Sequence, residues 1–488
     1  MKGVAEMKTL LAAAAVTLAL QPAFGQVETT PPPPSAPRQI QIPKPVEKTL
    51  ANGLRVIVIE KKGVPLVAAR LLIRNGGEAD PANLPGLADT TASLLTKGTT
   101  TRSAEQIARG VEALGATLDT SASWDQSSAD LDVLSSKLPA AMAFLADVVR
   151  HPTFKQDEID RLRQQNIDAL SVAMRQPGRL ANFVAAHVIF GAGPYGHNLG
   201  GTPESLARIK RDDIIAFHRD YYRPDNAILV LCGDITPAKA FATAQELLGG
   251  WKPATGSHPV PLAWIKDLPA PHVVVVDMPA AGQAAVVVGR PGLRRADPAY
   301  HLSLVTNSIL GGGYSSRLNE EIRIKRGLSY GAGSSFDLRR DVGPFSASAQ
   351  TKNESAAEVA GLIIDEMNKL GTTLVAGDEL GPRKAALIGG FGSQLETNKG
   401  IIGRIGTLAL YGLSLDEINR YISGVQSVAA SDVETFAAAH LAGNNASIVI
   451  VGDGKKFLPA LQQRFKDVEV IPIDELDVNS ATLRKGKT

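Results

Sequence analysis

Apolar and polar positions along this chain form short blocks typical of strands, followed by longer segments typical of helices. Two β-branched runs, 56–59 and 66–73, flank Lys-Lys-Gly and predict a β-hairpin. One helix is expected to begin after Pro85. Another is expected near Ser103, because Ser-Ala-Glu-Gln offers an N-cap followed by a charged first turn.

The same order of elements occurs twice. Three segments of the first half match three of the second in character, in the same order and at nearly constant spacing: "NAILVLCGD" (226–234) and "NASIVIVGD" (445–453), "RVIVIE" (55–60) and "HVVVVD" (272–277), "GLADTTASLL" (86–95) and "HLSLVTNSIL" (301–310). Such a repeat indicates an internal duplication. We therefore expect an α+β fold of two homologous halves, each a mixed β-sheet with helices packed on one face.

The N-terminus has the features of a secretory signal. Lys2 and Lys8 precede an apolar run that ends in the small residues Ala23 and Gly25, and this run is short for a membrane span. Cleavage is expected near Gly25, and an uncleaved membrane anchor is the alternative. The next segment, "TTPPPPSAPRQIQIPKP", favours an extended tether or a surface-packed arm.

These observations divide the chain into six parts. They are a signal peptide (1–25), a proline-rich extended segment (26–45), an N-terminal α+β domain (46–250), a linker rich in Pro and Gly (251–270), a C-terminal α+β domain (271–470) and a C-terminal tail (471–488).

Charge and cysteine content narrow the function. The 51 basic and 49 acidic residues nearly cancel, which argues against nucleic acid or anionic lipid as a partner. Cys232 is the only cysteine of the sequence, so the chain forms no internal disulfide and no thiolate metal cluster. Export without disulfides is compatible with the periplasm of a Gram-negative bacterium.

Four motifs carry a resemblance to a known family. The segments "GLADTTASLLTKGT", "YGHNLGGTPESL", "YYRPDNAILVLCGD" and "GGGYSSRLNEEIRIKRGLSYGAGSS" resemble the pitrilysin (insulinase) family of zinc metallopeptidases, the inverted zincins. The resemblance implies that each chain of this size builds half of a clam-like chamber. In active members, His-x-x-Glu-His on the first helix binds zinc through two histidines, and its glutamate activates the zinc-bound water.

The zinc motif is degenerate in this chain. Its three positions fall on Asp89, Ala92 and Ser93, and the family's third ligand falls near Asp160. Zinc needs three protein ligands at ~2 Å and a base for its water, and this set offers neither. The eight histidines include no pair at i,i+4 spacing. We expect no metal in this chain, and we interpret Asp89 and Ser93 as solvated or helix-capping residues.

The resemblance implies that the second half carries an arginine and a tyrosine seven residues apart. This chain has both, as Arg323 and Tyr330. A guanidinium and a phenol can donate hydrogen bonds to a substrate carbonyl and to the oxyanion formed from it. The alternative is a surface ion pair beside a half-buried phenol. Lys325 and Arg326 are interpreted as solvated cations.

The glycines that precede this pair have two interpretations. Gly311, Gly312 and Gly313 form either a tight turn that requires positive φ or a substrate-gripping loop.

The sequence thus predicts the non-metal subunit of an exported heterodimeric zinc metallopeptidase. A homologous partner with His-x-x-Glu-His would hold the zinc, and this chain would bind no cofactor and donate Arg323 and Tyr330. Substrates would be short or unfolded peptides held as an added strand. The alternative is a peptide-binding or structural scaffold resembling the core proteins of respiratory complexes.

Overall fold

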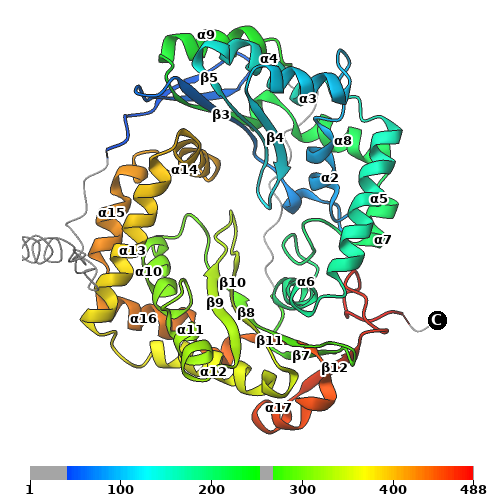
Figure 1. Ribbon diagram of the computed structural model, residues 1–488, viewed down its shortest axis with the longest axis vertical. Helices are drawn as coiled ribbons and strands as arrows, with labels where there is room; N and C mark the ends of the chain where they lie inside the picture. Colours follow the sequence, from blue (N-terminus) through cyan, green and yellow to red (C-terminus); the bar gives the residue numbers. More distant parts are fainter. Residues whose placement is uncertain (1–40, 253–267, 487–488) are drawn as a thin grey trace, which may run out of the picture. The chain divides into compact units, whose positions relative to one another are not determined.

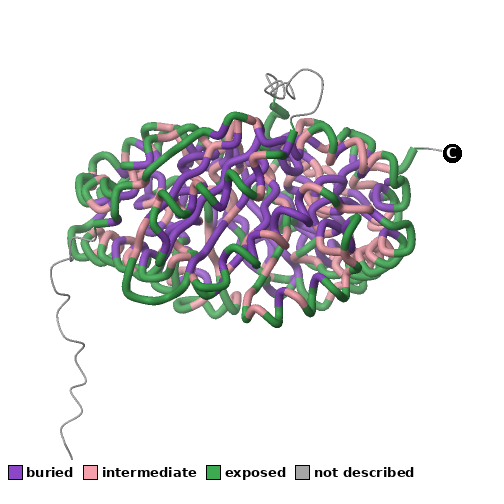
Figure 2. Tube along the Cα trace, turned by 90° about the horizontal axis from the view of Figure 1, so that it is seen from above, coloured by how far each residue is buried: buried purple, intermediate pink, exposed green. Residues whose placement is uncertain are grey.

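The computed structural model of this 488-residue chain describes residues 41–252 and 268–486. The predicted signal peptide, most of the proline-rich segment and the middle of the predicted linker lie outside the described residues. The described chain is α+β and contains two six-stranded mixed sheets, one in each half (Figure 1). Buried residues run through the inside of both halves, and exposed residues lie mainly at the outside (Figure 2).

The sheet of the N-terminal half has the strand order β1-β2-β6-β3-β5-β4. Its strands are β1 (Val46–Thr49), β2 (Arg55–Glu60), β3 (Leu66–Ile73), β4 (Thr117–Ala122), β5 (Ser127–Leu134) and β6 (Ala227–Gly233). Only β2 and β6 pair in parallel, and all other neighbours are antiparallel. Strand β4 is a free edge, with backbone groups available for another strand.

The predicted hairpin is wrong, although both of its strands exist. β6 lies between β2 and β3 and pairs with both of them. Every residue of β6 is buried. A fully apolar strand is best accommodated between two neighbours, because an edge position would leave its backbone unpaired and its side chains near water.

The sheet of the C-terminal half repeats this topology with the order β12-β7-β11-β8-β10-β9. Its strands are β7 (Val273–Asp277), β8 (Ala284–Pro291), β9 (Ser329–Phe336), β10 (Pro344–Thr351), β11 (Ser447–Gly452) and β12 (Val468–Pro472). β11 takes the place of β6, which confirms the duplication. The outer strands differ, because β1 precedes β2 in the chain whereas β12 comes from the C-terminal end and runs parallel to β7.

The helices of the first half are α2 (Leu87–Leu94), α3 (Ala104–Ala113), α4 (Leu138–Arg150), α5 (Gln156–Ala173), α6 (Pro177–Phe190), α7 (Pro203–Arg208), α8 (Arg211–Tyr221) and α9 (Pro237–Leu248). The two predicted helix starts are confirmed by α2 and α3. Ser103 caps α3, since its side chain accepts from the Gln106 backbone N–H at 3.2 Å and the Gln106 side chain accepts from the Ser103 N–H at 2.8 Å.

The helices of the second half are α10 (Tyr300–Leu310), α11 (Arg317–Asn319), α12 (Ala356–Leu370), α13 (Gly377–Leu395), α14 (Asn398–Leu410), α15 (Glu417–Ser427), α16 (Ala430–His440) and α17 (Leu458–Arg464). A π-helical turn, η4 (Glu320–Lys325), follows α11 directly. Within the described ranges, no helix is both long enough and apolar enough for a bilayer crossing.

The two halves exchange a helix. α6 of the first half packs on β8 and β11 of the second, and α14 of the second packs on β3 and β6 of the first. Leu180 and Val184 of α6 are buried with Val287 of β8, for example. Each sheet is therefore covered on one face by its own helices and on the other by a helix of the opposite half.

A hydrogen-bonded cluster also joins the two halves. Asp125, in the turn between β4 and β5, accepts hydrogen bonds from Tyr195 Oη (2.6 Å), Tyr411 Oη (2.9 Å) and the Arg340 backbone N–H (2.7 Å). The Arg340 guanidinium, from the turn between β9 and β10, lies 3.1 Å from the carboxylate of Glu78. Asp125 and Glu78 are buried, so this cluster binds the tip of one hairpin to the other half.

Candidate functional site

The predicted Arg/Tyr site lies between α10 and β9. The chain leaves α10 at Gly311, whose carbonyl accepts from the Ser334 N–H of β9 at 3.0 Å. A Cβ at Gly311 would lie 2.2 Å from the Ser334 nitrogen, whereas one at Gly313 would meet nothing within 4 Å. Gly311, Gly312 and Gly313 do not have positive φ. The interpretation based on positive φ is therefore wrong, and close approach to β9 is what requires glycine at Gly311.

Side chains from α13 hold the segment that follows. The Arg317 guanidinium makes a two-point ion pair with Glu379, at 3.0 and 2.7 Å. Arg383 donates to the Ser315 hydroxyl at 2.8 Å. Asn319 accepts from the Ala332 N–H of β9 at 3.3 Å. The loop after α10 is thus fixed between α13 and β9 before the chain enters η4.

The structure brings Arg323 and Tyr330 together. The Arg323 guanidinium carbon lies 5.0 Å from the ring centroid of Tyr330 and 4.6 Å from that of Tyr314. The Tyr330 side chain is 91% exposed and Tyr314 is 67% exposed. Tyr314 was missed by the sequence analysis, although it directly follows the three glycines of the motif that identified the other two residues.

A β-bulge decides which face of the sheet carries Tyr330. Ala332 pairs with Ala349 and Ser329 with Thr351, so Tyr330 and Gly331 both lie opposite Gln350. Gln350 is exposed, whereas its strand neighbours are buried against the helices of the same half.

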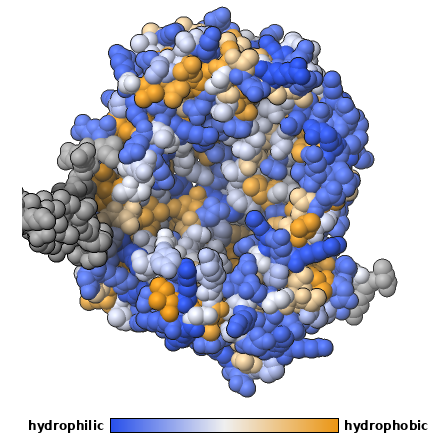
Figure 3. Space-filling view, in the orientation of Figure 1, coloured by the Kyte–Doolittle hydropathy of each residue, from blue (hydrophilic) through white to orange (hydrophobic). Residues whose placement is uncertain are grey.

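The surroundings of Gln350 identify that face. A Cβ added to Gly178 of α6 would lie 2.2 Å from its side-chain nitrogen. Tyr330 therefore belongs to the face that the other half covers with α6. Figure 3 shows the molecule hollowed between the two halves in the view of Figure 1.

Charge distinguishes Arg323 from its neighbours. Lys325 pairs with Glu321 at 3.1 Å, and Arg326 pairs with the same carboxylate. These two hydrogen-bonding cations hold the pKa of Glu321 below its usual value. Within residues 41–252 and 268–486, no carboxylate forms an ion pair with Arg323. Its guanidinium contacts the two aromatic rings instead, and the residue is half-buried.

The degenerate zinc positions lie in the other half, and they do not fit a metal. Ala92 is fully buried on α2 and Ser93 is half-buried. Asp160, on α5, is exposed and bonded to Gln156 (2.9 Å) and Arg163 (2.6 Å). The described part of the chain contains no group of three or more His, Cys, Asp or Glu residues that could hold a metal ion. No step of a reaction is therefore assigned to a metal on this chain.

The interpretation of Asp89 as solvated or capping is wrong. The carboxylate of Asp80 accepts from the Gly86 and Ala88 backbone N–H groups, both at 2.7 Å, and so caps α2 in its place. Asp89 is half-buried, and burial raises its pKa to about 6, with a further contribution from the nearby charge of Asp80. α2 packs against both α8 and β4, and Asp89 is half-buried in that setting.

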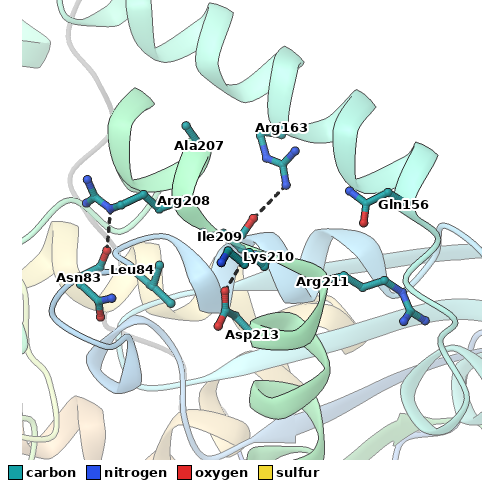
Figure 4. Close-up of a pocket in the computed structure, with 10 residues that line it drawn as sticks. All are labelled: Asn83, Leu84, Gln156, Arg163, Ala207, Arg208, Ile209, Lys210, Arg211 and Asp213. Carbon is teal, nitrogen blue, oxygen red and sulfur yellow. Dashed lines mark hydrogen bonds between the residues drawn. The ribbon is translucent and has the colours of Figure 1, made fainter.

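A cavity of about 520 Å³ between α5, α7 and α8 is rich in cations. Figure 4 shows that its polar groups mainly bond to one another: Arg163 donates to the Ile209 carbonyl (2.9 Å), Arg208 to the Asn83 carbonyl (3.2 Å), and the Lys210 N–H to Asp213 (2.8 Å). These bonds satisfy backbone groups at helix ends, so the cavity has a structural explanation.

A larger cavity, of about 790 Å³, lies beside α6 and the loop after it. The His197 ring lies 3.5 Å from the carboxylate of Asp80 at its wall. Its lining contains no nucleophile paired with a base, and the Asp80 carboxylate already caps α2.

Comparisons with known proteins agree with this arrangement. A sequence model of the insulinase family, peptidase family M16, matches residues 55–189, and a model described as the peptidase M16 inactive domain matches residues 208–381. An uncharacterized zinc protease of Streptomyces coelicolor is 26% identical over 407 residues, which cover 83% of this chain and 88% of that protein.

Two solved structures have the same fold. A peptidase M16 inactive domain from Pseudomonas fluorescens is 29% identical with a TM-score of 0.78, over 84% of this chain and 98% of that one. The periplasmic protease PqqL from Escherichia coli is 15% identical with a TM-score of 0.67, over 88% of this chain and 51% of that one. The two models of one family span most of residues 55–381, and the fold and motif order agree with them. The chain therefore belongs to the insulinase family, peptidase family M16, as a peptidase-like member without the His-x-x-Glu-His motif.

Proposed function

We propose that this chain is the non-metal subunit of a heterodimeric zinc metallopeptidase. The observation that carries the proposal is the state of Arg323: an ion-paired arginine would be a structural residue, but this one faces two exposed tyrosines and has no carboxylate partner among the described residues. A homologous subunit with His-x-x-Glu-His would bring the zinc and its water.

The length of a structural relative supports pairing. This chain corresponds to 51% of the periplasmic protease from Escherichia coli, which leaves about as much of that longer chain unmatched. A second chain of similar size would supply the equivalent of the unmatched part. Two such chains would enclose a chamber that admits short or unfolded peptides.

The chemistry assigned to this chain is hydrogen-bond donation. The Tyr330 hydroxyl and the Arg323 guanidinium would donate to the substrate carbonyl and more strongly to the oxyanion that forms when water attacks it. One such donor is worth about 2.7–4 kcal/mol in the transition state. β9 is the last strand of its sheet, but its Ala332 and Ser334 N–H groups already donate to Asn319 and Gly311, so an extended peptide could pair with it only at the Tyr330 end.

The proposed location is the periplasm. It rests on the signal-like N-terminus, with Lys2 and Lys8 before an apolar run, and on the single cysteine of the sequence. Immunoblotting of periplasmic and cytoplasmic fractions with an antibody to the chain tests it: a chain retained at full length in the cytoplasmic fraction would contradict export.

The test of the function is reconstitution. The chain alone is expected to cleave no fluorogenic peptide, and mixing it with a homologue that carries His-x-x-Glu-His should give activity. Tyr330→Phe in the mixture should lower kcat about 100- to 1,000-fold, the loss typical of one oxyanion donor. Arg326→Ala, which alters a nearby cation already paired with Glu321, is the matched control and should retain activity.

Two outcomes would contradict the proposal. The homologue could be equally active without this chain, or Tyr330→Phe could leave the rate of the mixture unchanged. Native mass determination would add a second criterion, since a mixed dimer fits the peptidase subunit, whereas a homodimer fits the alternative of a non-catalytic peptide-binding scaffold.

A further inference from the structure

Tyr314, Arg323 and Tyr330 form a group in which the Arg323 cation is accessible to a ligand of opposite charge. The Arg323 guanidinium lies within 4.6 Å of one ring centroid and 5.0 Å of the other. No described residue accepts a hydrogen bond from the Arg323 guanidinium, which is in contact with the two rings. The five donors lie in the plane of the group and so remain available at its edge.

The charges near Arg323 indicate which ligand the N–H donors of its guanidinium would bind. Glu321 is the nearest carboxylate in sequence to Arg323, and it is taken up by Lys325 and Arg326. Glu379, from α13, is taken up by Arg317. Both of these carboxylates thus serve other cations, and Glu320, which also lies on η4, forms no ion pair with Arg323 among the described residues. An uncompensated planar cation with a two-point donor edge matches a carboxylate.

The position of Tyr314 is fixed rather than incidental. Its backbone carbonyl accepts a hydrogen bond from the Asn319 side chain, and the neighbouring Ser315 and Arg317 are bonded to α13. Its backbone is therefore held in place, and from there its ring lies 4.6 Å from the Arg323 guanidinium carbon while the residue is 67% exposed. A ring in this place limits the rotamers of a long side chain and keeps its donor edge aimed to one side.

We propose that Tyr314, Arg323 and Tyr330 form a binding site for a peptide carboxylate, in which Arg323 makes the two-point contact, Tyr330 adds a hydroxyl donor and Tyr314 positions Arg323. The carboxylate comes either from the C-terminal end of a peptide or from an acidic side chain. The carboxylate site rests on the proposed function for its biological meaning. It extends that function by naming the chemical group of the peptide that Arg323 and Tyr330 bind.

The same chemistry connects the site to hydrolysis. When water adds to a peptide carbonyl and the C–N bond breaks, the amine leaves with a proton and the acyl fragment becomes a carboxylate. Donors placed for the oxyanion of the intermediate then face the carboxylate of the N-terminal fragment. Peptides with a free C-terminus should accordingly act as product-like ligands.

The experiment uses the full chain alone and isothermal titration with four versions of one short extended peptide. The first has a free C-terminus and no acidic residue, and the second is the same peptide amidated. The third and fourth are amidated and carry Glu or Gln at one internal position. At least one carboxylate version should bind about 10- to 100-fold tighter than its amide counterpart, as expected for hydrogen bonds to charged groups.

Variants assign the effect to the site. Arg323→Ala should remove the preference for the carboxylate, and Arg323→Lys should keep only part of it, because an ammonium lacks the fork. Arg326→Ala is the matched control and should retain the preference. Tyr314→Ala should weaken carboxylate binding several-fold, whereas Tyr314→Phe should not, since the ring is retained. Circular dichroism of each variant verifies folding.

The results separate cleanly. Equal binding of carboxylate and amide peptides, or no binding of any, overturns the proposal, as does a loss in Arg326→Ala equal to that in Arg323→Ala. A preference confined to the free C-terminus identifies the chain end as the source, and one confined to Glu identifies the side chain. The titration uses this chain without a partner subunit. Failure of reconstitution would therefore contradict the proposed function without deciding whether the site binds a carboxylate.

Discussion

Replacing Asp89 by asparagine is expected to stabilise the protein at neutral pH. Asp89 lies in the first turn of α2, half-buried, and no hydrogen bond to its carboxylate is found among the described residues. Burial raises its pKa from 3.8 to about 6, and the Asp80 carboxylate contributes to the same shift. Asparagine has nearly the same shape but no charge to bury.

The sign and size follow from linkage. A raised pKa means that the folded state favours the protonated acid, so the stability from this group is complete below about pH 4 and is lost as the pH rises through 6. The shift of about two units is worth roughly 2–3 kcal/mol, after allowance for partial exposure. Asp89→Asn should therefore match the wild type near pH 4 and exceed it by that amount above pH 7.

Thermal unfolding of both proteins at matched pH values between 4 and 8 measures the effect. The difference between the two midpoints isolates Asp89 from other titrating groups, since these are common to both chains. Asp160→Asn is the control, because Asp160 is exposed and bonded to Gln156 and Arg163, and exposed pairs contribute little. A midpoint for Asp89→Asn at or below the wild type at pH 7.5 would show that the carboxylate has a favourable partner and would refute the burial argument.

Three further predictions test the packing. Gly311→Ala should cost about 1–3 kcal/mol of stability by overpacking against β9, whereas Gly313→Ala should be neutral, and chemical denaturation compares the two. The Cys232 thiol is fully buried and burial raises its pKa to about 12, so thiol reagents should label it at pH 8 only after unfolding; rapid labelling of the native protein would contradict this. Arg340→Ala should cost about 2–4 kcal/mol in the unfolding midpoint by removing the donor to buried Glu78 and to the Arg74 and Asp125 carbonyls. Because burial raises the pKa of Glu78 to about 8, the loss should grow as the pH rises through 8 and the carboxylate ionises; a loss independent of pH would contradict this.

Local elements of the fold could be predicted because their signals are local. The apolar run of β6 and the Ser103 cap each depend on a few consecutive residues, and both are found in the structure. The duplication was predictable for the same reason, since equivalent strands keep equivalent patterns. The pairing of β2 with β6 was not, because these strands are far apart in sequence and the short connection from β2 to β3 resembles a hairpin loop.

The residues of the candidate site were likewise predictable only where a local sequence motif identifies them. Arg323 and Tyr330 were recognisable from their spacing in a motif, and their role in substrate binding stays a prediction. Tyr314 was missed because a ring beside a guanidinium results from the turn after α10 and leaves no spacing rule in the sequence. Asp89 was misinterpreted because a polar residue in a short helix is expected to face water, whereas α2 packs against α8 and β4 and Asp89 is half-buried.

The exchanged helices show why the half without a metal motif matters to the Arg/Tyr site. α6 belongs to the first half, and it covers β8 and β11 of the second. The same helix places Gly178 against Gln350, directly opposite the bulge that carries Tyr330. The first half therefore supports the face on which the tyrosine stands, even though it contributes none of the three residues of the Arg/Tyr site. Loss of the zinc ligands removes the metal chemistry from α2 and leaves this supporting role intact, which is a physical reason for a peptidase-like chain to keep both halves.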